Sequence, residues 1–193
     1  MSSGSVADAV SLVKELSRVE QPALIAIDGH SAAGKSTLAH TLQSALRDVQ
    51  IVYGDDFYRV MPETERFRLD APAGYGHYYD WERLERQVLI PLSDQQTARY
   101  KAYNWEIGAL SDWKVVQPYG AVIVEGVFSA RPELRGYYDA IFLVETEEKT
   151  RAWRQKQRAD AVDAWLERWD AAERFYMQTC NPNAYADLVI SLV

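Results

Sequence analysis

The eight residues GHSAAGKS at positions 29–36 constrain this 193-residue chain more than any other segment. They follow the apolar run ALIAI at 23–27, which is typical of a buried strand. They precede STLAHTLQSAL at 36–46, where leucines recur every fourth residue, as on one face of a helix. Glycines let the backbone curl so that successive N–H groups point inward, beside the positive end of that helix. The segment therefore predicts a strand–turn–helix unit whose turn binds an anion such as phosphate.

This turn matches the pattern G-x-x-x-x-G-K-[ST] in full. In that pattern the lysine, here Lys35, reaches the β- and γ-phosphates of a nucleotide, and the hydroxyl of Ser36 is offered to Mg²⁺. We therefore expect ATP or GTP as a ligand, together with Mg²⁺. His30 occupies a variable position and is expected to be a neutral loop residue. The predicted nucleotide-binding residues are Gly29, His30, Ser31, Ala32, Ala33, Gly34, Lys35, Ser36 and Thr37.

Apolar runs alternate with helical segments along the chain. Strands are predicted at 50–54, 121–128, 138–146 and 186–193, and helices at 5–19 and 147–177. WERLERQVLIPL at 81–92 predicts a helix stopped by its proline, 60–80 predicts a loop, and TARYKAYNW at 97–105 predicts a strand or hairpin arm. This order predicts an α/β fold of the P-loop NTPase type, a three-layer sandwich with helices on both faces of a mainly parallel sheet.

Composition limits the classes of partner. A net charge of -7 disfavours an extended polyanion, so no nucleic-acid partner is expected. The single cysteine, Cys180, excludes an internal disulfide and is compatible with a reducing compartment. No apolar run approaches the ~18 residues that a membrane span needs, and the first ten residues lack the order of a signal peptide. We therefore expect a cytoplasmic protein without a membrane partner.

Two nucleotide-dependent classes are disfavoured by the motifs that the chain lacks. A GTPase would be expected to carry an Asn-Lys-x-Asp motif, and the sequence contains none. A motor-type ATPase usually ends its second catalytic strand with two adjacent acids, whereas VIVEG ends with Glu125 and a glycine. A single carboxylate there is suited to order water bound to Mg²⁺, or to cap the next helix. A protein that transfers the phosphoryl group remains the favoured interpretation.

Asp55 and Asp56 directly follow the strand at 50–54, on the sheet edge where ligands of such folds bind. Phosphoryl transfer needs in-line positioning, neutralisation of charge and a carboxylate near the acceptor hydroxyl. Either aspartate could be that base, with the other assisting Mg²⁺, and a solvated turn is the alternative. The candidate metal ligands are Ser36, Glu125 and, of the two aspartates, Asp56.

Two further groups of residues complete the predicted site. Tyrosine, phenylalanine and tryptophan are concentrated between residues 53 and 105, where they could line a pocket for a flat or cyclic acceptor instead of forming core. Arg151, Arg154 and Arg158 fall on one face of the helix predicted from residue 147. Such a row could fold over nucleotide phosphates, or form a solvated face paired with acids. The tryptophans at 165 and 169 belong to an amphipathic stripe and are expected to be core.

Taken in order, IAIDGHSAAGKST, VYGDDFYRV, VIVEGVFSARPEL, TRAWRQKQR and YADLVI resemble the uridine kinase branch of P-loop kinases, which includes phosphoribulokinase and bacterial pantothenate kinase. The resemblance covers the chain from residue 23 to its end. It implies transfer of the γ-phosphate of ATP or GTP to a hydroxyl, in uridine kinases the 5′-hydroxyl of uridine or cytidine. It also implies Asp55, Arg154 and Arg158 as catalytic residues and Asp55, Tyr58 and Tyr103 as acceptor-binding residues. Lys35 of the P-loop is a further predicted catalytic residue, and Trp105, from the aromatic cluster, a further predicted acceptor-binding residue.

The chain departs from that branch at the acceptor end. Uridine kinases usually place a histidine and an arginine shortly after their Tyr-Asp motif, whereas YNWEIGALSDW contains neither. We expect one kinase domain over 1–193, with an acceptor region at about 57–118 and a lid at about 147–165. The sequence is also compatible with a homo-oligomer. A kinase of pantothenate or a sugar, and a regulatory protein that binds ATP without transferring phosphate, are the alternatives.

Overall fold

The computed structural model describes residues 2–17, 21–157 and 163–192. In this part of the chain six strands form one parallel sheet in the order β1-β8-β7-β2-β6-β3. The strands are β1 (Ser2–Gly4), β2 (Ala23–Asp28), β3 (Val49–Tyr53), β6 (Ala121–Glu125), β7 (Ala140–Glu145) and β8 (Leu188–Ser191). The predicted parallel α/β sheet is thereby confirmed. The pairing of β1 with β8 was not predicted, because MSSG has no apolar pattern.

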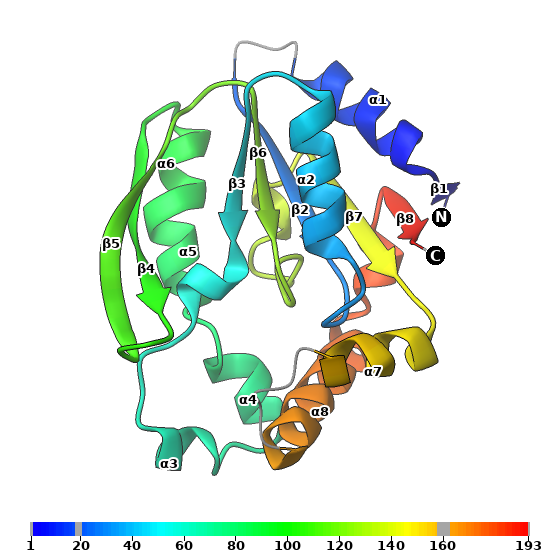
Figure 1. Cartoon of the computed structure of the whole chain (residues 1–193). Helices are drawn as coiled ribbons and strands as arrows, with labels where there is room; N and C mark the ends of the chain where they lie inside the picture. The colour runs from blue at the N-terminus through cyan, green and yellow to red at the C-terminus, as the bar shows by residue number, and fades with distance from the viewer. Residues whose placement is uncertain (1, 18–20, 158–162, 193) are drawn as a thin grey trace.

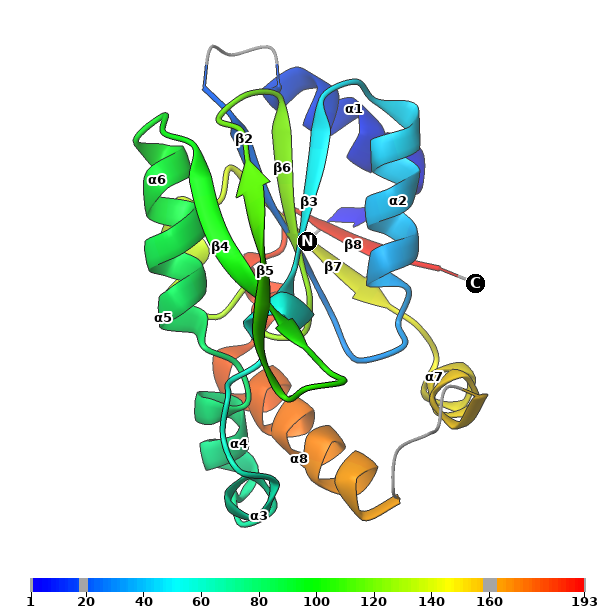
Figure 2. The same cartoon turned by 60° about the vertical axis from the view of Figure 1, so that its left-hand side comes forward.

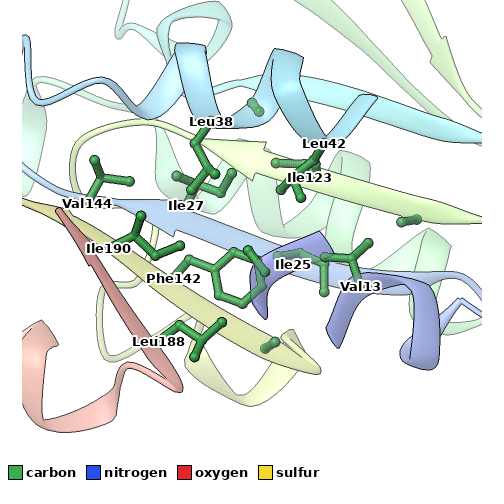
Figure 3. Packing of buried hydrophobic residues seen from close by; sticks show 14 of the residues in the cluster. Val13, Ile25, Ile27, Leu38, Leu42, Ile123, Phe142, Val144, Leu188 and Ile190 are labelled. Atoms are coloured by element: carbon green, nitrogen blue, oxygen red, sulfur yellow. The ribbon is translucent and has the colours of Figure 1, made fainter. Parts of the chain in front are cut away.

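Both faces of the sheet are covered, as the continuous apolar strands require. On one face, helices α1 (Val6–Leu16) and α2 (Lys35–Ala45) pack on the strands. There Leu38 and Leu42 of α2 meet Ile25, Ile27 and Ile123 in the cluster that Figure 3 shows. On the opposite face, alternate residues of the same strands pack against α5 (Trp81–Leu84), α6 (Ile90–Ser93) and β4 (Ala98–Asn104). This alternation produces the three layers expected from the sequence.

The segment that follows β3 is more helical than the sequence indicated. Residues 60–80, predicted as a loop, contain α3 (Glu63–Arg66) and α4 (Ala71–His77). Helix α4 begins with Pro72 in its first turn, where a proline N–H is not needed, and the side chain of Asp70 accepts a hydrogen bond from Ala73 N at 2.9 Å. The prolines that indicated a loop therefore include one that begins a helix.

The prediction that Pro91 ends a helix is also wrong. Helix α5 continues through a π-helical turn (Glu85–Leu89) directly into α6, which has Pro91 in its first turn. In a π turn the hydrogen bonds shift to i→i−5, as in the bond from Ile90 N to Glu85 O, so the missing N–H of proline costs less there. Strand β4 then pairs antiparallel with β5 (Ala109–Val116), so the predicted hairpin arm is confirmed.

The predicted helical region 147–177 comprises two helices, α7 (Glu148–Gln157) and α8 (Asp163–Cys180). Together with α4 they lie beyond the end of the sheet toward which the arrowheads of β3, β6 and β7 point in Figure 1. Helix α4 packs along α8. In the described part of the chain, no helix is both long and apolar enough to cross a membrane. The fold thus places helices α4, α7 and α8 at the carboxyl edge of the sheet.

Candidate active site

The turn after β2 is held in the conformation that its glycines permit. Gly29 has φ 141°, and a Cβ there would lie 2.3 Å from the carbonyl oxygen of Val144 on β7. Only glycine fits that position without displacing backbone. Lys35, at the start of α2, is buried and donates from Nζ to the carbonyl oxygens of Gly29 and His30, both at 2.9 Å. The lysine therefore folds back over the turn, with its charge at the turn's centre.

Helix α2 begins within this turn and supplies further donors. Gly34, with φ 108°, is its N-cap, and no side chain caps the helix. The N–H groups of Lys35, Ser36 and Thr37 therefore have no acceptor within the helix. All three residues line a cavity of ≈ 420 Å³. A phosphate group in this cavity would meet orphan backbone donors, the positive end of the helix and an ammonium group together.

The cavity extends from the P-loop to a wall built by distant segments. Besides the P-loop and α2, its lining comes from the end of β3, the end of β6, the tip of the β4–β5 hairpin and helices α7 and α8. Its lining residues beyond the P-loop are Asp55, Tyr58, Tyr79, Trp105, Glu125, Gly126, Val127, Gln155, Trp165, Leu166 and Trp169. The volume falls within the range of small-molecule sites in proteins. One cavity therefore joins the phosphate-binding turn to an aromatic chamber.

Glu125 ends β6 beside the P-loop, with 6% of its surface exposed. Its Oε1 accepts a hydrogen bond from Ser36 Oγ at 2.9 Å. Burial raises the pKa of Glu125 above its ordinary value, and the nearby charge of Lys35 and the Ser36 hydrogen bond oppose that shift. A hydroxyl and a carboxylate side by side are hard oxygen ligands of the kind that Mg²⁺ prefers, so the residues fit this metal.

The described residues contain no cluster of three or more acidic, histidine or cysteine side chains that would hold a metal alone. This agrees with a Mg²⁺ site of the nucleotide-dependent kind, in which one or two protein oxygens act together with substrate phosphates and water. Ser36 and Glu125 are the two side chains that the structure brings together for that role.

Asp55 and Asp56 point in different directions, although the sequence could not distinguish them. Both belong to a 3₁₀ turn (Gly54–Phe57) that follows β3. Asp55 lines the cavity, and its Oδ1 accepts a hydrogen bond from the Tyr79 hydroxyl at 2.6 Å. Burial and the nearby Asp55 charge raise the pKa of Tyr79 well above its ordinary value, so this hydroxyl keeps its proton and donates. Asp55 is thus held by its neighbour while it faces the cavity.

Asp56 is turned into the protein instead. Its carboxylate accepts hydrogen bonds from Lys114 Nζ on β5 at 2.9 and 2.8 Å and from the Tyr100 hydroxyl on β4 at 2.9 Å. It is buried and is not among the residues that line the cavity. The sequence-based assignment of Asp56 to the metal therefore has to be revised, because this carboxylate ties the hairpin to the end of β3.

The three predicted acceptor aromatics have unequal positions. Tyr58 and Trp105 line the cavity, with ring centroids 4.5 Å apart. Tyr103 does not line it but packs edge-on behind both, at 5.2 Å from Tyr58 and 5.1 Å from Trp105. Trp105 is 60% exposed at the hairpin tip. Tyr58 and Trp105 are thus placed to contact a ligand, and Tyr103 supports them.

Helix α8 supplies residues that the sequence pattern assigned to the core. Ala172 and Tyr176 are buried as expected, whereas Trp165 and Trp169 are half-buried and line the cavity. Their spacing of four residues predicts a common helix face, but not that the face borders a cavity. Tyr79 was also missed, because nothing in YYDW distinguishes it from the tyrosine before it.

The predicted arginine row is divided by the structure. Arg154 Nη1 donates to the carbonyl oxygen of Ala32 at 3.4 Å, so it lies over the P-loop. Arg151 is buried and pairs instead with Asp170 of α8, with 3.1 Å between Nη2 and Oδ1. Arg158 lies outside the described residues. Of the predicted nucleotide-binding residues, Gly29, His30 and Ala33 do not line the cavity, and His30 hydrogen-bonds to Glu173 of α8.

A parallel α/β sheet with this P-loop, a strand-end carboxylate facing it and helices bordering the same cavity is typical of P-loop kinases. The chain belongs to the phosphoribulokinase/uridine kinase family, whose sequence profile matches residues 24–193. It is 24% identical over 192 residues to a uridine kinase of Lactobacillus helveticus, covering 91% of this chain and 89% of that one. It is 26% identical over 187 residues to a uridine kinase of Limosilactobacillus reuteri, covering 89% and 84%.

Solved structures show the same fold. A structure described as a "possible uridine kinase" from Bacillus stearothermophilus matches with a TM-score of 0.72 at 23% identity, covering 96% of this chain and 98% of that one. D-glycerate 3-kinase from Cryptococcus neoformans matches with a TM-score of 0.55 at 14% identity, covering 93% and 87%. At these identities the likeness concerns the fold alone. The family makes this chain a kinase of small molecules that carry a hydroxyl group.

The raised pKa of Glu125 predicts opposite effects of pH on the apo protein and on Mg²⁺ binding. In Glu125→Gln the buried charge is lost, so the apo variant should be thermally more stable than the apo wild type. This difference should be larger at about pH 8 than at about pH 5.5, because wild-type Glu125 is more often protonated at the lower pH. Conversely, Mg²⁺-dependent ADP binding by the wild type should weaken as pH falls through the raised pKa. Thermal unfolding and calorimetric titration across that range measure both. An Mg²⁺ dependence unchanged in Glu125→Gln would contradict this assignment.

The hydrogen bond from Tyr79 to Asp55 predicts a selective loss of turnover in Tyr79→Phe. The variant keeps the ring but removes a donor to a carboxylate, so Asp55 loses its fixed orientation and acceptor-dependent ADP release should fall about 10-fold. ADP affinity should stay unchanged, because Tyr79 does not belong to the P-loop. Tyr119→Phe, on an exposed loop residue, is the matched control. Wild-type turnover by Tyr79→Phe would show that Asp55 does not need this tyrosine.

Proposed function

We propose that this protein transfers the γ-phosphate of ATP to a hydroxyl group of an uncharged, ring-containing acceptor, most simply a nucleoside of the uridine or cytidine type. The observation that carries the proposal is that Asp55 and the P-loop open onto one cavity of ≈ 420 Å³ from the ends of β3 and β2, the two strands that flank β6. The named relatives are uridine kinases, which supports the same acceptor class.

The side chains divide the reaction between them. Lys35 and the N–H groups at the start of α2 would hold the β- and γ-phosphates, and Arg154 would close over them from the lid helix. Ser36 and Glu125 would hold Mg²⁺ together with the phosphates, and the metal would supply charge neutralisation. Asp55 would orient the acceptor hydroxyl and accept the proton of that hydroxyl. The acceptor oxygen would then bond to the γ-phosphorus while the bond between the γ-phosphorus and ADP breaks. We propose that the lid spans about residues 147–165 and that Arg158 acts from it, as Arg154 does.

The charge of the cavity favours an uncharged acceptor over an anionic one. Among the described residues that line it, the charged side chains are Lys35, Asp55 and Glu125. Lys35 is engaged with the P-loop, so no cation in that set faces the aromatic chamber. A hydroxy acid or pantothenate would bring its carboxylate beside Asp55 without a counter-ion, which is costly in a partly desolvated site. An uncharged ring can instead pack on the exposed Trp105, beside Tyr58.

We further propose that residues 57–118 form the acceptor-binding part of a single kinase domain and that the enzyme works in the cytoplasm. The aromatic chamber supports the first of these proposals. Tyr58, Tyr79 and Trp105 come from this segment and line the same cavity as Asp55. The single cysteine, which is unpaired and half-buried beside the Tyr75 hydroxyl, supports the second, because such a cysteine is compatible with a reducing compartment.

Replacing the proposed base gives a direct test. Asp55→Asn keeps the shape of the side chain but cannot take up a proton, so acceptor-dependent ADP release should fall at least about 100-fold. ATP binding should be retained, because Asp55 does not contribute to the P-loop. Asp112→Asn, at an exposed site on β5, is the control. Turnover within about threefold of wild type would rule out Asp55 as the base.

A screen of acceptors tests the charge argument. Purified protein is supplied with ATP, Mg²⁺ and, separately, uridine, cytidine, neutral sugars, pantothenate or glycerate, and the release of ADP above background is measured. We expect release with an uncharged compound and none with the two acids. Preferential release with an acid would contradict the proposed acceptor class. Silence with every acceptor, together with ATP-dependent capture of a protein partner, would favour the regulatory alternative.

A further inference from the structure

The P-loop is held from outside by a carboxylate of the last long helix. Glu173 of α8 is fully buried, with 0% of its surface exposed. Its two oxygens accept hydrogen bonds from the backbone N–H of Ser31 at 3.2 and 3.1 Å and from the Ser31 hydroxyl. His30 Nδ1 lies 2.9 Å from Oε2. A buried carboxylate thus contacts two consecutive residues of the phosphate-binding turn.

Glu173 carries a negative charge in this position. Burial opposes ionisation most strongly, but hydrogen bonds from His30 and Ser31 and the nearby charge of Lys35 together hold the pKa of Glu173 below its ordinary value. Arg151 of α7 adds a cation, with Nη1 3.6 Å from Oε2. Because an ionised carboxylate can only accept hydrogen bonds, His30 must donate from Nδ1. The charge is therefore matched by hydrogen-bond donors of the turn and by a nearby cation of α7.

This contact decides which donors of the turn can serve a nucleotide. The N–H of Ser31 points to Glu173, and the N–H of Ala33 is bonded to the His30 carbonyl oxygen at 3.2 Å. The N–H groups of Lys35, Ser36 and Thr37 at the start of α2 therefore remain as donors for phosphate. Glu173 holds the first half of the turn, whereas the start of α2 faces the cavity.

A second residue of α8 extends this contact to the acceptor side. Trp169 Nε1 donates to Ser31 Oγ at 2.7 Å. The same indole packs edge-on against Tyr79, with ring centroids 5.6 Å apart, and Tyr79 donates to Asp55. One helix therefore touches the phosphate-binding turn through Glu173 and Trp169, and the aromatic wall beside the base through Trp169.

We propose that Glu173 and Trp169 are positioning residues: they fix His30 and Ser31 so that the P-loop is preorganised for the nucleotide, and they set the turn's distance from the acceptor wall. A competing role for Glu173 is that its charge repels phosphate and restrains binding. The two roles predict changes of opposite sign when the charge is removed. The proposal rests on the nucleotide-binding part of the proposed function and does not depend on the acceptor.

The test is calorimetric titration of the full chain with ADP and Mg²⁺, comparing wild type with Glu173→Gln and Trp169→Phe. Glu173→Gln keeps the size of the side chain but replaces one acceptor oxygen by a donor, so we expect the dissociation constant to rise about 10-fold. Trp169→Phe keeps a ring but removes the donor to Ser31, and we expect a rise of about threefold. Because both side chains bond to Ser31, the effects in the double variant should be less than additive.

The control is Glu167→Gln, an exposed glutamate on the same helix, which should bind ADP as wild type does. A merely structural role would reduce the fraction of binding-competent protein and the melting temperature, while the folded molecules would keep the wild-type dissociation constant. Tighter or unchanged ADP binding by Glu173→Gln, with unchanged binding by Trp169→Phe, would overturn the proposal. Failure of the wild type to bind ADP would instead contradict the proposed function itself, and this proposal with it.

Discussion

Backbone hydrogen bonds between the parallel strands β2, β6 and β3 place Ile27, Glu125 and Tyr53 side by side. The segments after these residues begin at the same edge of the sheet, so the P-loop, the proposed metal-binding carboxylate and the proposed base become neighbours. Close approach of the backbones reinforces this, because a Cβ on Gly126 would lie 3.0 Å from the Cα of Gly54. The distance across which phosphate would move is therefore set by strand pairing, which is among the most rigid features of an α/β protein.

The rest of the chain surrounds this edge. The hairpin brings Trp105 over one side of the cavity, and its root is fixed by the bonds from Lys114 and Tyr100 to Asp56. Helix α8 closes the opposite side with Trp165 and Trp169. Excluding water from such a chamber strengthens the interactions of its few charged groups and limits hydrolysis of the nucleotide. In the proposed function, the aromatic residues would therefore act by excluding water as well as by contacting the acceptor.

The nucleotide end of the site could be predicted from sequence because that end is local. The P-loop, Asp55 and Glu125 each follow or end an apolar run, so strand periodicity alone places them at the carboxyl edge. The choice between Asp55 and Asp56 could not be made from sequence, because it depends on how a 3₁₀ turn orients two adjacent side chains. The roles of Trp169 and Glu173 depend on contacts with Ser31 that span 138 and 142 residues. Similarly, Pro72 and Pro91 indicated breaks, whereas a cap and a π turn accommodate them.

The most direct measurement is a crystal structure with Mg²⁺ and a non-hydrolysable ATP analogue. We expect the β- and γ-phosphates to lie against Lys35 and the start of α2, with Mg²⁺ beside Ser36 and Glu125. We also expect the terminal phosphate to face the carboxylate of Asp55, with room for one hydroxyl group between them. A terminal phosphate directed away from Asp55, or an Asp55 side chain turned out of the cavity in that complex, would contradict the proposed phosphoryl transfer.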